Sequence, residues 1–108
     1  MTVKQLADSA DFSAVCLPSE ERRIDGAYVG DLLSWVMGRA NADNAWITIM
    51  SNVNVIAVAT LTDVACVIFA EGVVPDDVLI DVASQKNVNI LTTSLPAYEA
   101  ALRLSELI

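Results

Sequence analysis

Residues 53–70, VNVIAVATLTDVACVIFA, form an apolar stretch whose interpretation decides the fold. A membrane span would require about 20 predominantly apolar residues. Asp63 interrupts the run, at a cost of about 3 kcal/mol inside a bilayer, and no Lys or Arg flanks it. The segment TLTD within it is typical of a boundary between two elements. We therefore predict a buried helix followed by a buried strand, and no association with a membrane.

The strand of this pair, residues 64–70, is continuously apolar, as is typical of a strand covered on both faces of a parallel sheet. The neighbouring sequence continues the alternation of strand and helix. It predicts a strand over 45–50, a helix over 76–86, a strand over 88–93 and a last helix opened by Ser94 and Pro96. Short connections between such elements predict an α/β layered fold with a mainly parallel central sheet flanked by helices.

The first half of the chain is less regular. Thr2 is placed to cap a helix from Val3 to about Ser9, and residues 13–17 and 24–29 are expected to be extended. Asp31 is predicted to cap a helix that ends at Gly38. The expected apolar stripe of this helix consists of Leu32, Leu33, Val36 and Met37.

The helix that begins after residue 50 is apolar nearly all round, so we expect it to be buried. Ser51 or Asn52 is predicted to cap it, and it extends to about Leu61. The later helix over 76–86 has Asp76 and Asp77 at its start, where carboxylates stabilise the helix dipole.

The composition predicts one cytoplasmic domain, residues 1–108, because the N-terminus has no signal-peptide apolar region. Six basic against 14 acidic residues give a formal charge of −8, which argues against nucleic-acid binding. Cys16 and Cys66 lie in apolar stretches and are expected to be buried. The hydrophobic fraction of 55%, together with Trp35 and Trp46, predicts burial against a second subunit, hence a homodimer.

Parallel strands end at a common edge of the sheet, where polar loops and helix amino termini converge. We expect a ligand crevice there, or residues that only cap helices. The candidates are Ser51, Asn52, Asn54, Glu71, Gly72, Thr92, Thr93 and Ser94. Except for Glu71 they are small and uncharged, which suits a neutral or phosphate-bearing ligand.

Catalysis has little support in the sequence. The chain has no histidine, which excludes Ser-His-Asp and Cys-His nucleophile systems, and its two cysteines lack zinc-site spacing. It also lacks a Gly-rich phosphate loop. We predict a non-enzyme with no cofactor and no metal; a minor enzyme using Asp25, Asp31 or Glu71 is the weaker hypothesis.

The stretch EERRIDGAY, residues 20–28, has two interpretations. In the structural one, its arginines are solvated and pair with Glu20 or Glu21. In the functional one, Arg22 or Arg23 offers a bidentate fork to an anion and Gly26 lets the backbone approach the ligand closely.

The same stretch resembles the motif of the DRTGG domain family, which reads approximately Asp-Arg-x-Val-Thr-Gly-Gly-Tyr-x-x-Asp-Leu-Leu-Ser. Residues 21–34 here read ERRIDGAYVGDLLS, so Arg22, Gly26, Tyr28 and DLLS match, whereas Glu21, Asp25 and Ala27 depart from the motif. The resemblance continues through AWITIMSNVNVIAVA and LTTSLPAYEAALRL. The family motif has a Thr at the position of Asp25. A Thr hydroxyl can donate a hydrogen bond to an anion, whereas the Asp25 carboxylate would repel it. The strand-end loops are therefore the better candidate site.

This resemblance implies a DRTGG-like α/β domain, similar in fold to the amino-terminal domain of HPr kinase/phosphorylase. It also implies a regulatory or dimer-forming role without catalytic activity. We therefore predict a non-enzymatic regulatory homodimer that binds a small nucleotide-like or phosphorylated ligand. The alternative is an interaction subunit of a larger redox or metabolic enzyme, with no small-molecule ligand.

Overall fold

The computed structural model describes all residues, 1–108, and contains five helices and five strands. In chain order these are α1 (Val3–Ala7), β1 (Ser13–Cys16), β2 (Ala27–Val29), α2 (Leu33–Arg39), β3 (Ala45–Thr48), α3 (Asn54–Thr62), β4 (Cys66–Phe69), α4 (Asp77–Gln85), β5 (Ile90–Thr92) and α5 (Ala97–Leu107).

The strands form one sheet in the order β1-β5-β4-β3-β2. The four strands β2 to β5 are parallel, and β1 is antiparallel to β5 at the edge of the sheet. Every residue of β3 and β4 is buried, because these strands have neighbours on both sides and helices on both faces. The predicted α/β fold with a mainly parallel central sheet is confirmed.

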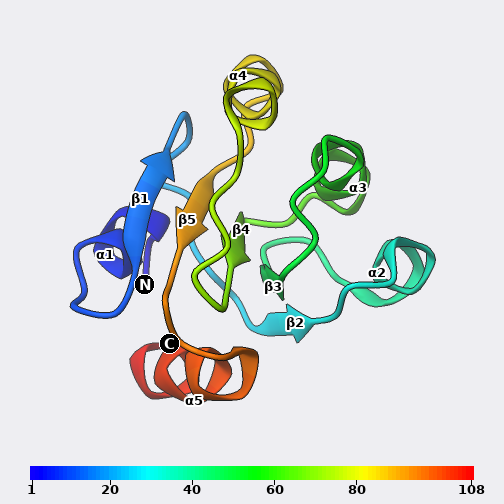
Figure 1. Cartoon of the computed structure of the whole chain (residues 1–108). Coiled ribbons are helices and arrows are strands. Elements are labelled where there is room, and N and C mark those ends of the chain that lie inside the picture. Colours follow the sequence, from blue (N-terminus) through cyan, green and yellow to red (C-terminus); the bar gives the residue numbers. More distant parts are fainter.

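Figure 1 shows helices on both faces of the sheet: α2, α3 and α4 cover one face, and α1 and α5 the other. Alternate residues of the central strands point to opposite faces. Thus Ile47 and Ile68 pack in the core beneath α1 and α5, whereas Trp46 and Phe69 pack beneath α2, α3 and α4. Trp46 is completely buried inside the subunit, so the expectation that it is covered by a second subunit is wrong.

The stretch 53–70 divides as predicted, into α3 and β4. Asp63 adopts a left-handed conformation, with φ of 59°, and ends α3. No helix of the structure combines the length and the apolar character needed to cross a membrane.

The structure corrects the expectation that α3 is buried all round. Its inner face is buried, including Val55, Ile56 and Ala59, but Ala57 and Leu61 on the outside are exposed. The helix is the outer layer of its side of the sheet, so nothing in the subunit covers it. Its apolar outer face is therefore left open.

Helix α2 also differs from the prediction. Leu32 occupies the cap position without a side-chain bond, because the Asp31 carboxylate instead accepts hydrogen bonds from the Thr48 hydroxyl (2.8 Å) and the Ile49 amide (2.9 Å) at the end of β3. The helix continues past Gly38 to Arg39. Of the predicted apolar stripe only Val36 is buried and Leu33 half-buried, while Leu32 and Met37 are exposed.

The other helix starts agree better with the sequence. Thr2 forms a capping box with Gln5, and the Asp76 carboxylate accepts from the Leu79 amide. Pro96 precedes α5 as predicted, but no side chain caps that helix, so Ser94 is not a cap. Neither predicted residue is the cap of α3, which is Val53; Asn52 forms a turn just before it instead.

Candidate functional site

The predicted site residues lie at two opposite edges of the sheet. Because β2 to β5 are parallel, the loops that follow them share one edge, here called the carboxyl edge. The segments that precede these strands share the other, the amino edge. Arg22 and Gly26 precede β2 and lie at the amino edge. The carboxyl edge holds the remaining candidates, Ser51, Asn52, Asn54, Glu71, Gly72, Thr92, Thr93 and Ser94.

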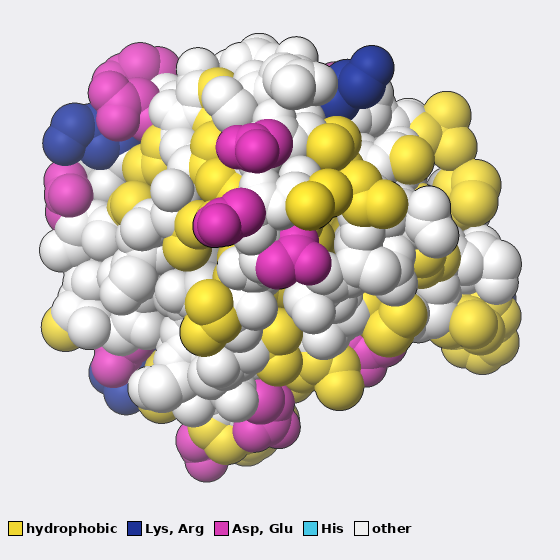
Figure 2. All heavy atoms as spheres, turned by 45° about the horizontal axis from the view of Figure 1, so that its top comes forward, with side chains coloured by type: hydrophobic (Ala, Val, Ile, Leu, Met, Phe, Trp, Pro, Cys, Tyr) yellow, Lys and Arg dark blue, Asp and Glu magenta, His cyan; other side chains and the backbone are white.

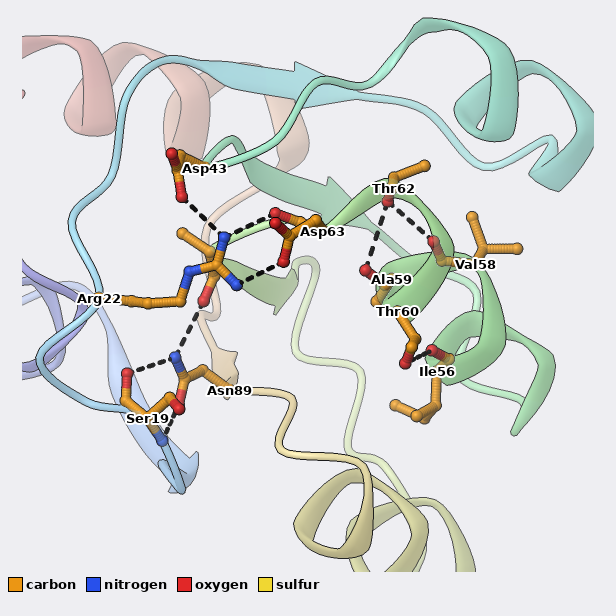
Figure 3. Close-up of polar contacts among 11 residues, drawn as sticks. Ser19, Arg22, Asp43, Ile56, Val58, Ala59, Thr60, Thr62, Asp63 and Asn89 are labelled. Carbon is orange, nitrogen blue, oxygen red and sulfur yellow. Dashed lines mark hydrogen bonds and ion pairs between the residues drawn. The ribbon is translucent and has the colours of Figure 1, made fainter.

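At the amino edge, the guanidinium of Arg22 makes three hydrogen bonds within the subunit (Figure 3). It donates to the carboxylate of Asp63 (2.9 Å), the carboxylate of Asp43 (2.7 Å) and the carbonyl of Asp63 (2.7 Å). Partial burial lowers the pKa of Arg22, but its bonds to the two aspartates outweigh this and leave the pKa above its ordinary value. The Arg22 side chain therefore joins the turn that contains Asp43 to the turn that contains Asp63.

The structure thus supports a structural role for Arg22, but with other partners than predicted. Neither Glu20 nor Glu21 pairs with an arginine; the partners are the aspartates that precede β3 and β4. Both of these aspartates have positive φ, 67° for Asp43 and 59° for Asp63. Their turns bring the two carboxylates to one side chain that is distant in sequence.

Gly26 also serves the internal structure. Its φ is +88°, and a Cβ added there would lie 3.2 Å from the side-chain nitrogen of Asn44. That nitrogen donates to the carbonyl of Asp25 at 2.9 Å. The close approach that Gly26 allows is therefore to Asn44.

Asn89 completes the amino edge, and the sequence did not single it out. Its side chain accepts from the Ser19 amide (2.9 Å) and donates to the Ser19 carbonyl (2.8 Å), as Figure 3 shows. It also donates to the Ala65 carbonyl (2.9 Å). Like Asn44, it is a buried asparagine directly before a buried strand. An asparagine directly before an apolar strand is therefore a pattern in the sequence that could have indicated this role.

At the carboxyl edge, many polar groups are also used internally. The amides of Glu71 and Gly72 donate to the carbonyls of Leu95 (2.9 Å) and Thr93 (3.0 Å), and both residues have positive φ in a tight turn. The buried Thr93 hydroxyl donates to the Asp11 carbonyl (2.7 Å) and accepts from the Leu95 amide (3.2 Å). These bonds join the loops after β4 and β5.

The start of α3 is similarly occupied. The Asn52 carbonyl oxygens, side chain and backbone, accept from the amides of Asn54 (2.9 Å) and Val55 (3.1 Å). The amide of Ile56 donates to Val53. The Ser51 hydroxyl, the side-chain amides of Asn52 and Asn54 and the backbone amides of residues 51–53 donate to no acceptor in the protein.

The loop after β5 also retains unused donors, and these lie at the start of the longest helix. The first three amides of α5, those of Ala97, Tyr98 and Glu99, donate to no acceptor in the protein, and Pro96 provides no side-chain cap. The hydroxyls of Thr92 and Ser94 are also unpaired. Tyr98 lies in the first turn of α5, and its side chain is 73% exposed. No pattern in the sequence singles out this tyrosine.

The cysteines are poor nucleophiles. Burial raises the pKa of the Cys66 thiol to about 12, although the positive charge of Arg22 lowers it slightly. Burial also raises the pKa of Cys16. Both thiols are therefore mainly protonated at neutral pH, and the thiolate is the reactive form.

Two hollows mark the surface, and neither lies between the loops of the carboxyl edge. The larger, of about 500 Å³, runs between α3 and α4 and has Asn54 at one end. The smaller, of about 440 Å³, lies along residues 18–22 and includes Arg22. Since β2 to β5 follow one another in space as in the chain, the parallel strands also have no reversal of order at which a crevice would open.

Comparison with known proteins identifies a likeness of fold. No family model and no curated protein matches the chain. Among solved structures, it resembles the CBS and DRTGG domains of the regulatory region of Clostridium perfringens pyrophosphatase, in complex with the activator diadenosine tetraphosphate. The TM-score is 0.67 at 18% identity, over 86% of this chain and 40% of that one. The chain therefore shares its α/β fold with part of a regulatory region.

Proposed function

We propose that this chain is a non-catalytic regulatory module that binds a small nucleotide-like or phosphorylated ligand. The observation that carries the proposal is the fold likeness to part of a regulatory region that was solved with a dinucleotide activator. The chain spans 40% of the chain in that structure, its Cys66 thiol is fully buried, and it has no histidine to activate a hydroxyl. Noncovalent binding fits these residues better than catalysis does.

The loop after β5 is the part of the carboxyl edge best equipped for such a ligand. The free amides at the start of α5 and the hydroxyls of Thr92 and Ser94 suit a phosphate group. The exposed ring of Tyr98 suits stacking with a base, which contributes about 1–3 kcal/mol. Ser51, Asn52, Asn54, Glu71 and Gly72 would then line the remaining part of this edge.

Electrostatics restrict the ligand. Glu99 lies in the first turn of α5, Glu71 follows the neighbouring strand, and the chain carries a formal charge of −8. Like charges disfavour a polyphosphate without a counterion. We therefore propose a ligand with few negative charges, or one neutralised by Mg²⁺.

The test is calorimetric titration of the protein with AMP, and with ATP in the presence and absence of Mg²⁺. We expect AMP and Mg-ATP to bind and free ATP to bind more weakly. Tyr98→Ala should weaken AMP binding by about tenfold or more, whereas the matched Tyr98→Phe should retain it, since the ring remains. Absence of binding at about 1 mM of every nucleotide would contradict the proposal.

The second candidate function is interaction with another polypeptide, and a separate surface favours it. Strand β2 is the open edge of the sheet, and Val29, Leu32 and Trp35 near it are 48, 59 and 55% exposed. Arg39 stacks over the Trp35 ring at 4.0 Å. Open strand edges and exposed aromatic side chains are typical of subunit contacts. We propose that a second copy of the chain covers this surface.

Light scattering at several protein concentrations tests this dimer. The expected mass is twice that of the chain, and Trp35→Ala should shift the equilibrium towards the monomer. Tyr98→Ala, which removes an exposed aromatic side chain elsewhere, is the matched control and should leave the mass unchanged. A monomer across the micromolar range would exclude the dimer.

A further inference from the structure

A groove between α3 and α4 is not explained by the proposed ligand site or by the proposed dimer surface. It has a volume of about 500 Å³. One wall consists of Val53, Ala57, Thr60 and Leu61, and the other of Val82 and Lys86. Val53, Ala57 and Leu61 are spaced by four residues and so lie on one stripe of α3. The groove is therefore a furrow between two helices with mainly apolar walls.

The exposed side of α3 carries no charge, which is unusual for this chain. Residues 51–62 contain no Lys, Arg, Asp or Glu, although the protein has 14 acidic residues. Exposed Leu61 is 68% and Val53 43% accessible to solvent. An outer helix face without charged residues resembles a surface that another polypeptide covers.

The polar side chains of α3 do not change this character. The Thr60 hydroxyl donates to the Ile56 carbonyl (2.9 Å) and the Thr62 hydroxyl to the Val58 carbonyl (2.8 Å), as Figure 3 shows. Both hydroxyls are satisfied within the helix and need no water or ligand. Burial of this face would therefore leave few polar groups without a partner.

Lys86 gives the groove a charge at one end. It is the only charged residue in its walls, is exposed, and forms no ion pair. It lies at the end of α4, whereas Asn54 lies at the start of α3. In Figure 2, hydrophobic side chains gather on the right of the view beside a basic group, and acidic side chains gather nearer the centre. The one charge in the groove walls is thus positive, although the protein as a whole is strongly acidic.

We propose that the groove between α3 and α4 binds an amphipathic helix of a partner protein, with a carboxylate of that helix paired to Lys86. The length of α3 from Val53 to Leu61 is about 12 Å, or about two turns. A groove of this length therefore accommodates apolar side chains at positions i, i+3 or i+4, and i+7 of the partner helix. A contact of two grooves would bring two Lys86 side chains together, whereas an acidic partner helix offers a carboxylate to one of them, so we choose the partner helix. No residue that lines the groove belongs to the loop after β5, so docking there does not rest on the proposed nucleotide site.

Two synthetic peptides test the proposal against the intact chain. Both peptides are helices of about four turns with leucines at positions i, i+4 and i+7. They differ only in having Glu or Lys at one end. Fluorescence anisotropy should show tighter binding of the Glu peptide. Lys86→Glu should reverse this preference, by about fivefold in each direction, since an exposed ion pair contributes at most about 1 kcal/mol.

Filling the groove separates docking there from binding elsewhere. Ala57→Trp places an indole on its wall and should reduce Glu-peptide affinity at least about tenfold. The control Ala10→Trp adds the same indole in the exposed turn after α1 and should leave the affinity unchanged. Leu61→Ala, which removes an exposed side chain without adding bulk, should also weaken binding.

Three results would overturn the proposal. The first is no binding of either peptide at about 1 mM. The second is binding that Ala57→Trp, folded as judged by circular dichroism, does not weaken. The third is a dimer in light scattering that Ala57→Trp abolishes, because this would assign the groove to a second copy of the chain.

Discussion

The two edges of the sheet use their polar residues differently. At the amino edge, Arg22, Asn44 and Asn89 direct their side chains to groups of the protein itself. At the carboxyl edge, the loop between β5 and α5 keeps amides and hydroxyls without a partner. Side chains that are satisfied internally contribute to stability, whereas unused donors are available to a ligand. We therefore expect substitutions at the amino edge to change stability, and those at the loop after β5 to change binding.

The largest expected effect concerns the chemistry of Cys66, which lies at the amino end of β4. With a pKa of about 12, its thiolate fraction at pH 8 is about a thousandfold below that of an ordinary thiol. In a Cys16→Ser variant, reaction with a disulfide reagent should be correspondingly slow in the folded protein and fast after unfolding. Equal rates in both states would show that the amino edge is open.

The same thiol gives a pH dependence of stability. The pKa of Cys66 in the folded state lies above its unfolded value, taken as 9.0, so the folded protein holds the proton more strongly. Its contribution is complete below that value and is lost as the pH rises from about 9 towards 12. Denaturant unfolding at increasing alkaline pH should show this decline, and Cys66→Ala should reduce it.

Asn89→Ala should cause the next largest effect. It removes three hydrogen bonds and leaves the Ala65 carbonyl and the Ser19 backbone groups without partners. We expect a loss of about 3 kcal/mol in the free energy of unfolding. The matched control Asn54→Ala, at an exposed position without side-chain hydrogen bonds, should change it by less than about 0.5 kcal/mol. Similar losses of unfolding free energy for both variants would contradict the assignment of Asn89 to stability and of Asn54 to an exposed, unbonded position.

Arg22→Ala should cost less, because the side chains of Asp43 and Asp63 are 52 and 68% exposed and solvent screens their charges. We expect about 1 kcal/mol, decreasing at high salt. The neighbouring Arg23→Ala is the control, since Arg23 is exposed and forms no ion pair. If Arg22→Ala instead abolished nucleotide binding at unchanged stability, the amino edge would be the ligand site.

The smallest effect on stability is expected at the loop after β5. Tyr98→Ala removes a ring that is 73% exposed, so the free energy of unfolding should change by less than about 0.5 kcal/mol. Thermal unfolding with and without AMP measures the stability of the variant and its binding of AMP in one experiment. The increase in melting temperature caused by AMP should be lost although the ligand-free value is retained. If the variant without AMP instead had a much lower melting temperature, Tyr98 would contribute to the stability of the fold.

The fold was predictable because its main signal is local. The continuous apolar run 64–70 and the alternating elements around it identify a parallel sheet, and the break at Asp63 is visible in the sequence. The start of α2 was not predictable, because the Asp31 carboxylate accepts a hydrogen bond from Thr48 at the end of the neighbouring strand β3 and does not cap the helix. The partners of Arg22 likewise depend on two turns that are distant in sequence. Pairings of this kind follow from strand order, which local patterns do not specify.

The candidate site shows the same limit. Residue types placed the polar loops at the carboxyl edge, but they could not show which amides are already bonded. The turn at Glu71 uses its donors internally, whereas the start of α5 does not. The sequence predicts that the outer face of α3 is core, whereas Ala57 and Leu61 are exposed, because an apolar side chain does not by itself show that another part of the subunit covers it.

A titration of the ¹⁵N-labelled protein with AMP, followed by amide chemical shifts, tests the central claim most directly. We predict saturable shifts for residues 92–99, with smaller changes in the adjoining loops 51–54 and 71–72 and none at Arg22 or Asn89. Absence of shifts, or shifts concentrated at the amino edge, would contradict the assignment of the loop after β5 as the ligand site.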